Sequence, residues 1–182
     1  MADPTTYLHD RIETPVGRLV VVSDGEGRLR MVWFDDRGRG DWRASLFARY
    51  PEAKLIKEDD PHGFSSALNA YFSGEVSVLD GLRVAFQGTP FQMKVWKALR
   101  SIPCGATQSY GALARRIQEP SAVRAVGLAN GANPIAIVVP CHRVIGSDGS
   151  LTGYGGGLPR KKWLLAHEAR YTASNFRLES SA

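Results

Sequence analysis

A thiol, an imidazole and a guanidinium follow one another at the end of an aliphatic run. The segment PIAIVVPCHRVIG places Cys141, His142 and Arg143 directly after Pro140. The run Ile135–Val139 is typical of a strand buried on both faces, and reactive groups often lie where such a strand reaches the surface. A thiol with an ordinary pKa of about 8.5 is only a few per cent ionised at neutral pH. A nucleophilic Cys141 therefore needs a base or a positive field.

The base could come from two places in the sequence. His142 is adjacent to the thiol, although neighbours on a strand point to opposite faces. His167 and Glu168 follow later, in the segment AHE, and could orient a base if the fold brings them back. The alternative is that Cys141 is a small core residue, since cysteine is among the residues most often buried and inert.

The segment between residues 89 and 131 predicts three helices. Thr89 and Pro90 are typical of a helix start. Two short helices, Ser109–Ile117 and Ser121–Asn130, are joined tightly in the manner of a helix-turn-helix. Few large side chains project from the second helix, for which Ser121 is the expected cap. Its small residues are Ala122, Ala125, Gly127, Ala129 and Gly131.

A helix with small side chains can approach another surface closely. That surface could be a packed neighbouring element or a nucleic-acid groove. Arg124 is the one long cation on this helix, and an arginine in a packed core needs a partner. We therefore favour DNA contact, with backbone contacts fixing the position of the helix. The absence of several base-reading side chains favours the minor groove.

The first third of the chain is rich in strand patterns. We expect strands at Leu8–Glu13, Gly17–Ser23 and Leu29–Phe34, and a further strand at Leu82–Phe86. Aromatic stripes predict two amphipathic helices, around residues 42–50 and 64–73, whose apolar faces belong to the core. A glycine-rich loop and a closing amphipathic helix, LPRKKWLLAHEARY, follow Cys141.

Composition sets limits on the class of protein. The chain has 182 residues, a net charge of +5 and only two cysteines. Residues 85–182 carry 12 Lys and Arg against 4 Asp and Glu, whereas the first 84 carry 11 against 14. A polyanion would meet the second half. No signal-peptide pattern or metal-ligand spacing is seen, so we expect a cytoplasmic protein with free thiols and without metal or cofactor.

Four separated motifs carry a family resemblance: SAVRAVGLANGANP, IVVPCHRVIG, LTGYGGG and WLLAHE. In order and spacing they resemble the O6-alkylguanine-DNA alkyltransferases, over about residues 89–168. The resemblance implies an α/β (α+β) fold. We expect an N-terminal ribonuclease H-like domain at 1–84, a C-terminal DNA-binding and alkyl-acceptor domain at 85–170, and a loosely held tail at 171–182.

The resemblance also implies roles for individual residues. Cys141 would take the alkyl group from O6 of a damaged guanine, His142 would act as base through a bridging water, and Glu168 would orient the imidazole. Asn133 would lock the turn before the active-site segment, and Tyr110 would help guanine leave. Arg124 would fill the gap left by the flipped base. The base pocket would be formed by Val139, Tyr154, Gly155 and Gly156.

The expected activity is a single-turnover methyl or small-alkyl transfer from duplex DNA by a monomer, with O6-alkylguanine as the substrate and O4-alkylthymine as a second candidate. Two rival functions stay open at this point. A cysteine hydrolase would turn over repeatedly, but it needs an oxyanion hole, and nothing indicates a helix N-terminus directly after Cys141. A non-catalytic helix-turn-helix regulator would have no use for the thiol.

Overall fold

A four-stranded mixed sheet forms the core of the N-terminal half. The structure is a computed structural model that describes residues 5–36 and 40–179. The strand order is β3-β2-β1-β4, with β1 antiparallel to β2, β2 antiparallel to β3, and β4 parallel to β1. The strands are β1 Thr6–Ile12, β2 Leu19–Asp24, β3 Leu29–Phe34 and β4 Lys54–Lys57. The three expected N-terminal strands are confirmed within a few residues, whereas the mostly exposed edge strand β4 was not foreseen.

Both faces of this sheet are covered, which agrees with the period of two in β2. Val20 and Val22 pack toward helix α1, Trp42–Arg49, which buries Trp42 and Leu46. Leu19 and Val21 point to the opposite face, where they join the main core together with helix α2, Phe64–Ser73. A short 3₁₀ turn, Pro61–Gly63, precedes α2. The aromatic stripes are therefore core, as expected.

The predicted strand at Leu82–Phe86 is wrong. The chain makes only an isolated bridge there, between Leu29 and Val84. Leu29 donates its N–H to Arg83, and Ala85 donates its N–H to Leu29. The connection therefore forms a single bridge, at the first residue of β3, and then leaves the sheet.

The C-terminal half is mainly helical. Its helices are α3 Pro90–Leu99, α4 Tyr110–Arg116, α5 Val123–Gly131 and α6 Leu158–Glu179, and a short parallel pair joins β5 Gln108–Ser109 to β6 Val144–Ile145. Thr89 and Gln92 form a reciprocal capping box at α3, and Ser109 caps α4. The mixed α/β class is thus confirmed.

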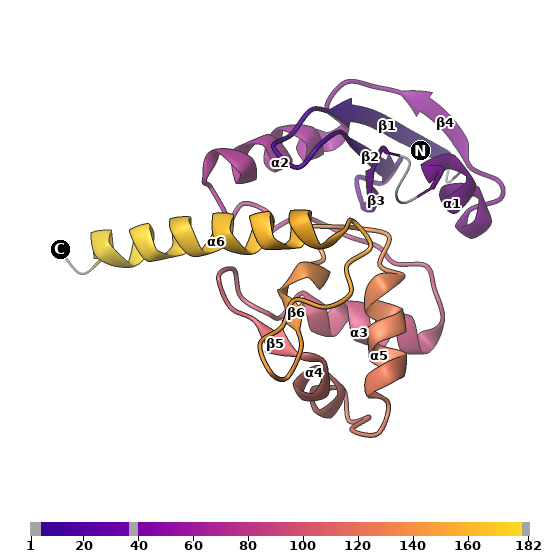
Figure 1. The fold of residues 1–182 in the computed structure, drawn as a ribbon. Coiled ribbons are helices and arrows are strands. Elements are labelled where there is room, and N and C mark those ends of the chain that lie inside the picture. Colours follow the sequence, from indigo (N-terminus) through magenta and orange to yellow (C-terminus); the bar gives the residue numbers. More distant parts are fainter. Residues whose placement is uncertain (1–4, 37–39, 180–182) are drawn as a thin grey trace.

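Helix α6 runs between the sheet and the other C-terminal helices, as Figure 1 shows. Its backbone continues without a break to Glu179, so residues 171–179 extend the helix, and 180–182 lie outside the described residues. In the described part of the chain, no helix has the length and apolar character needed to cross a membrane.

The apolar run before Cys141 is buried but is not a strand. Only Ile135 bridges to the sheet, at Val32, and the chain then turns, with Ile137 in the left-handed region at φ 71°. Turn hydrogen bonds take the place of a ladder: Val138 donates to the carbonyl of Ala136, and Val139 to that of Ile135. The prediction of a strand at Ile135–Val139 is therefore wrong, because burial without periodicity does not distinguish a strand from a packed turn.

Candidate active site

Cys141 begins a 3₁₀ turn, Cys141–Arg143, at the end of this buried run. The thiol is 3% exposed, and the side-chain amide of Asn133 lies 3.2 Å from its Sγ. The same amide donates to the carbonyl of Val139 at 2.8 Å, while its Oδ1 accepts from the N–H of Ile135 at 3.0 Å. Asn133 therefore fixes the turn that presents the thiol, in agreement with its expected position.

Glu168 gathers a buried network around the residues that follow the thiol. Its carboxylate is 2.8 Å from Nε2 of His142 and accepts two hydrogen bonds of 2.9 Å from Arg143. The hydroxyl of Tyr71 donates to it at 2.9 Å, and the N–H of Gly105 at 3.3 Å. Helix α2, one loop and the 3₁₀ turn thus meet at the fully buried carboxylate that α6 supplies.

The charges in this network set the protonation states. Burial alone would raise the pKa of Glu168, but hydrogen bonds and charges from His142 and Arg143 outweigh it and hold that pKa well below its usual range. Burial lowers the pKa of His142, against the opposing pull of Glu168. His142 is therefore neutral at physiological pH beside an ionised carboxylate.

The second nitrogen of His142 has a different environment. Because Nε2 faces the carboxylate, a neutral ring donates from Nε2 and leaves Nδ1 as an acceptor. That Nδ1 is buried and has no hydrogen-bond partner among the described residues. The arrangement is that of a base whose tautomer is fixed by a carboxylate, as in enzymes that activate a nucleophile through histidine.

A cavity of about 450 Å³ opens beside helix α5. It is lined by residues of α4, α5 and the glycine-rich loop 146–157: Tyr110, Val123, Arg124, Gly127, Leu128, Gly131, Thr152, Gly153 and Tyr154. Cys141 does not line it. Burial raises the pKa of the Tyr110 hydroxyl, and the Cys141 thiol raises it further. Tyr110, Arg124 and Tyr154, which the sequence analysis assigned to base flipping and the pocket, all line this cavity.

The exposed face of α5 carries most of the residues predicted to meet DNA. Arg124 and Ala125 are exposed, and Arg124 forms no ion pair with any residue in the described ranges. Two predictions are corrected. The helix begins at Val123 after Ala122 and has no side-chain cap, so Ser121 does not cap it.

Ala129 is the second correction, because it is 3% exposed and faces the core. Its carbonyl accepts a hydrogen bond of 2.8 Å from Nε1 of Trp96. The small side chain of Ala129 therefore serves close packing of α5 on α3, and it cannot contact a ligand. Gly131, expected to stop the helix, is its last residue.

The other predicted pocket residues lie around the cavity without lining it. Val139 is fully buried, and Gly156 packs so closely on Phe34 that a Cβ would lie 2.5 Å from its ring. Gly155 is exposed on the same loop. His167, considered as a partner of the base, instead bonds the carbonyl of Tyr71 at 2.8 Å, so Glu168 alone orients the imidazole.

Several residues of the site were not predicted. Arg143 had been noted as a cation but not as the second partner of Glu168, and Leu128 and Thr152 lack any chemical signal in the sequence. Lys161 is fully buried and was not singled out. A lysine on the apolar face of a helix is the one signal that could have found it. Among the described residues, no three His, Cys, Asp or Glu side chains come together as metal ligands.

Comparisons with known proteins agree with this arrangement. The family model described as 6-O-methylguanine DNA methyltransferase, DNA binding domain, matches residues 90–170. A methylated-DNA–protein-cysteine methyltransferase of Salmonella typhimurium is 51% identical over 162 residues, which cover 88% of this chain and 95% of the relative.

Two crystal structures from Mycobacterium tuberculosis are similar over nearly the whole fold. The O6-methylguanine methyltransferase has a TM-score of 0.76 at 39% identity, covering 91% of this chain and 94% of that one. The OGT protein in complex with DNA has a TM-score of 0.73 at 40% identity, covering the same shares. This chain belongs to the methylated-DNA–protein-cysteine methyltransferase family, whose members act in DNA repair, and DNA is its partner.

Proposed function

We propose that this protein repairs alkylated DNA by moving a methyl or small alkyl group from O6 of guanine to its own Cys141, once per molecule. The observation that carries the assignment to Cys141 is the chain of contacts around it: Asn133 at the sulfur, and His142 held by an ionised Glu168. The family relationship supports the reaction class, and the structure supplies the residues that can perform it.

The step balances without a cofactor. The Cys141 thiol loses its proton to His142, through one bridging water at Nδ1. The sulfur then attacks the alkyl carbon, the carbon–O6 bond breaks with its electron pair on guanine, and the guanine anion takes up one proton, which balances the proton that the thiol gave to His142. Tyr110 supports the neutral leaving group from the cavity wall. A thioether is stable to hydrolysis, so the protein is consumed by the reaction.

Access to the base requires that it leave the duplex. An O6-alkyl group in stacked DNA is out of reach of a thiol that is 3% exposed, so the nucleotide is flipped into the cavity. The low profile of α5 lets it lie in the minor groove, and Arg124 enters the stack in place of the base. The protein acts as a monomer in the cytoplasm, where DNA is available.

The direct test is the intact mass of the protein after incubation with a duplex containing O6-methylguanine. A gain of one methyl group that maps to Cys141 and is lost in Cys141→Ser supports the proposal. Repeated turnover, or an adduct at Cys104, would contradict it.

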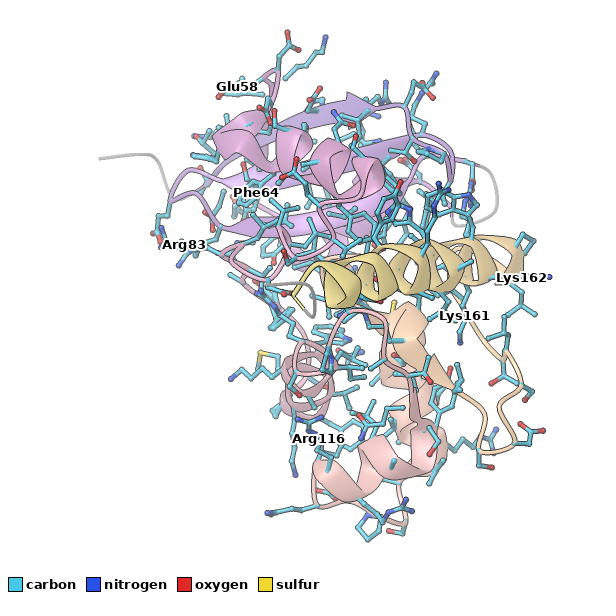
Figure 2. All side chains as sticks on the ribbon, turned by 90° about the vertical axis from the view of Figure 1, so that its left-hand side faces the viewer. Glu58, Phe64, Arg83, Arg116, Lys161 and Lys162 are labelled. Carbon is cyan, nitrogen blue, oxygen red and sulfur yellow. The ribbon has the colours of Figure 1, made fainter. Side chains whose placement is uncertain are left out.

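The role of Arg124 is tested by comparing two substrates. Arg124→Ala should slow repair of duplex DNA far more than the reaction with free O6-benzylguanine, which needs no flipping. Arg83→Ala is the matched control, since it removes the same charge from an exposed position near the sheet, distant from α5 (Figure 2). Equal losses on both substrates for Arg124→Ala would rule out the stacking role.

A further inference from the structure

Lys161 is a buried cation that lacks an acidic partner. Its side chain is fully buried, in the first turns of α6, and no carboxylate of the described residues lies within ion-pair distance of it. Burial lowers its pKa, and the nearby Cys141 thiol opposes that shift. Its neighbour Lys162 is exposed and points outward in Figure 2. Since isolated buried ammonium groups are costly, a specific arrangement must hold this one.

Two backbone carbonyls hold it. The Nζ of Lys161 donates to the carbonyl of Val144 at 2.6 Å and to that of Thr152 at 2.7 Å. Val144 lies one residue beyond the 3₁₀ turn of Cys141 and belongs to β6. Thr152 lies in the glycine-rich loop and lines the cavity. One ammonium group thus joins α6, the segment that carries the thiol, and the loop that forms the pocket wall.

The same carbonyl also receives Tyr110. The hydroxyl of Tyr110 lies 3.2 Å from the carbonyl oxygens of both Thr152 and Gly153. The ammonium of Lys161 is 6.0 Å from the centre of the Tyr110 ring. The carbonyl of Thr152 therefore joins the ammonium of Lys161 to the hydroxyl of Tyr110.

We propose that Lys161 is a positioning residue for alkyl transfer: it anchors the glycine-rich loop 146–157 against β6 and, through the carbonyl of Thr152, aligns Tyr110 in the pocket. The inference rests on the proposed function for its effect on activity, but the anchoring itself does not depend on it. A purely structural buried lysine would affect stability and leave the loop and Tyr110 uncoupled.

The test compares Lys161→Met, which keeps most of the aliphatic volume, with Lys162→Met. Hydrogen exchange measured by mass spectrometry should show exchange in 146–157 accelerated at least about 10-fold in Lys161→Met, the factor that one charge-assisted hydrogen bond is worth. The amides of β2 and α3 should keep their wild-type rates, and Lys162→Met should match wild type throughout. Unchanged exchange in 146–157, or a uniform increase over the whole chain, would overturn the anchor.

The effect on function is measured with free O6-benzylguanine. Lys161→Met should raise its half-saturating concentration by about 10-fold or more for the same reason. In a Tyr110→Phe background the further loss in the second-order rate constant should be smaller than the loss that Lys161→Met causes in the wild-type protein, since both residues act through one carbonyl. Independent losses would exclude the coupling to Tyr110. If wild type transfers neither the benzyl group nor the methyl group of O6-methylguanine in duplex DNA, the proposed function fails, and the exchange measurement still decides the role of Lys161.

Discussion

Replacing Glu168 by glutamine tests the buried network most directly. The carboxylate accepts from His142, Tyr71, Gly105 and, twice, Arg143 at distances between 2.8 and 3.3 Å. A glutamine amide has one oxygen, and its NH₂ group takes the place of the second carboxylate oxygen. Because both carboxylate oxygens accept hydrogen bonds, the NH₂ group would face donors in either orientation of the amide. At least one hydrogen bond of Arg143 is lost, and a guanidinium with only 5% of its side chain exposed loses its counter-charge.

The magnitude follows from breaking a buried ion pair on one side, which costs about 3–5 kcal/mol. A domain is stable by about 5–15 kcal/mol, so Glu168→Gln should lower the midpoint of urea unfolding markedly and still leave folded protein at low temperature. The matched control is Glu119→Gln, whose ion pair with Lys94 is about half exposed, at 45% and 44%. That change should cost no more than about 1 kcal/mol.

Alkyl transfer by the folded fraction of Glu168→Gln should fall further than its stability explains. A glutamine can donate to Nε2 of His142, which moves the ring proton to Nδ1 and removes the base. Replacing the orienting carboxylate of a serine protease triad by an amide lowers the rate by about 10⁴-fold, which sets the upper end of the expected loss. If the free energy of unfolding of Glu168→Gln lies within about 1 kcal/mol of the wild-type value and the variant transfers at the wild-type rate, then Glu168 neither stabilises the fold through Arg143 nor orients His142.

Three other outcomes are expected. Burial and, after it, the nearby Glu168 raise the pKa of Cys104 to about 12. Iodoacetamide should therefore label Cys104 slowly at neutral pH, and Cys104→Ser should retain full methyl transfer, whereas rapid labelling would contradict this. Gly156→Ala places a Cβ 2.5 Å from the ring of Phe34 and should cost about 1–3 kcal/mol in urea unfolding, whereas an unchanged midpoint would show that the loop yields freely. The pKa of buried His142 is lowered from 6.5, so below that pH the unfolded chain binds the proton first and stability should fall by up to about 1.4 kcal/mol per pH unit. Glu168, with its lowered pKa, adds a further loss below its unfolded pKa of 4.5. Flat stability between the two unfolded pKa values would refute the effect of His142, and a slope that does not steepen below the lower one would refute that of Glu168.

Local signals in the sequence predicted local structure well. The cap at Thr89 could be predicted because its side chain bonds to an N–H three residues away, so that the information is contained in one turn. The strands β2 and β3 were recognised from their apolar runs and flanking turns. The same reading failed at Ser121, where no side-chain cap forms.

The run Ile135–Val139 shows why the active-site backbone could not be predicted. Its composition is that of a strand, but the amide of Asn133 bonds to two of its residues and Ile137 adopts a positive φ, so that the chain folds on itself. Motif resemblance predicted that Glu168 contacts His142, and the structure places the two 2.8 Å apart, because the resemblance carries information from a whole fold. It did not reveal Lys161, whose importance depends on which carbonyls surround it.

Helix α6 explains why the site requires residues that are far apart in the sequence. One face of this helix carries three fully buried residues, Lys161, Leu164 and Glu168. They share that face because they are spaced three and four residues apart. Two turns apart on that face, Glu168 holds the residues that follow the thiol, while Lys161 holds the wall of the pocket. The relative position of nucleophile and substrate pocket is therefore set by one rigid helix, whose rise of about 1.5 Å per residue places the two anchors about 10 Å apart. A protein that reacts once gains from this rigidity, because the thiol must be correctly placed when a damaged base enters.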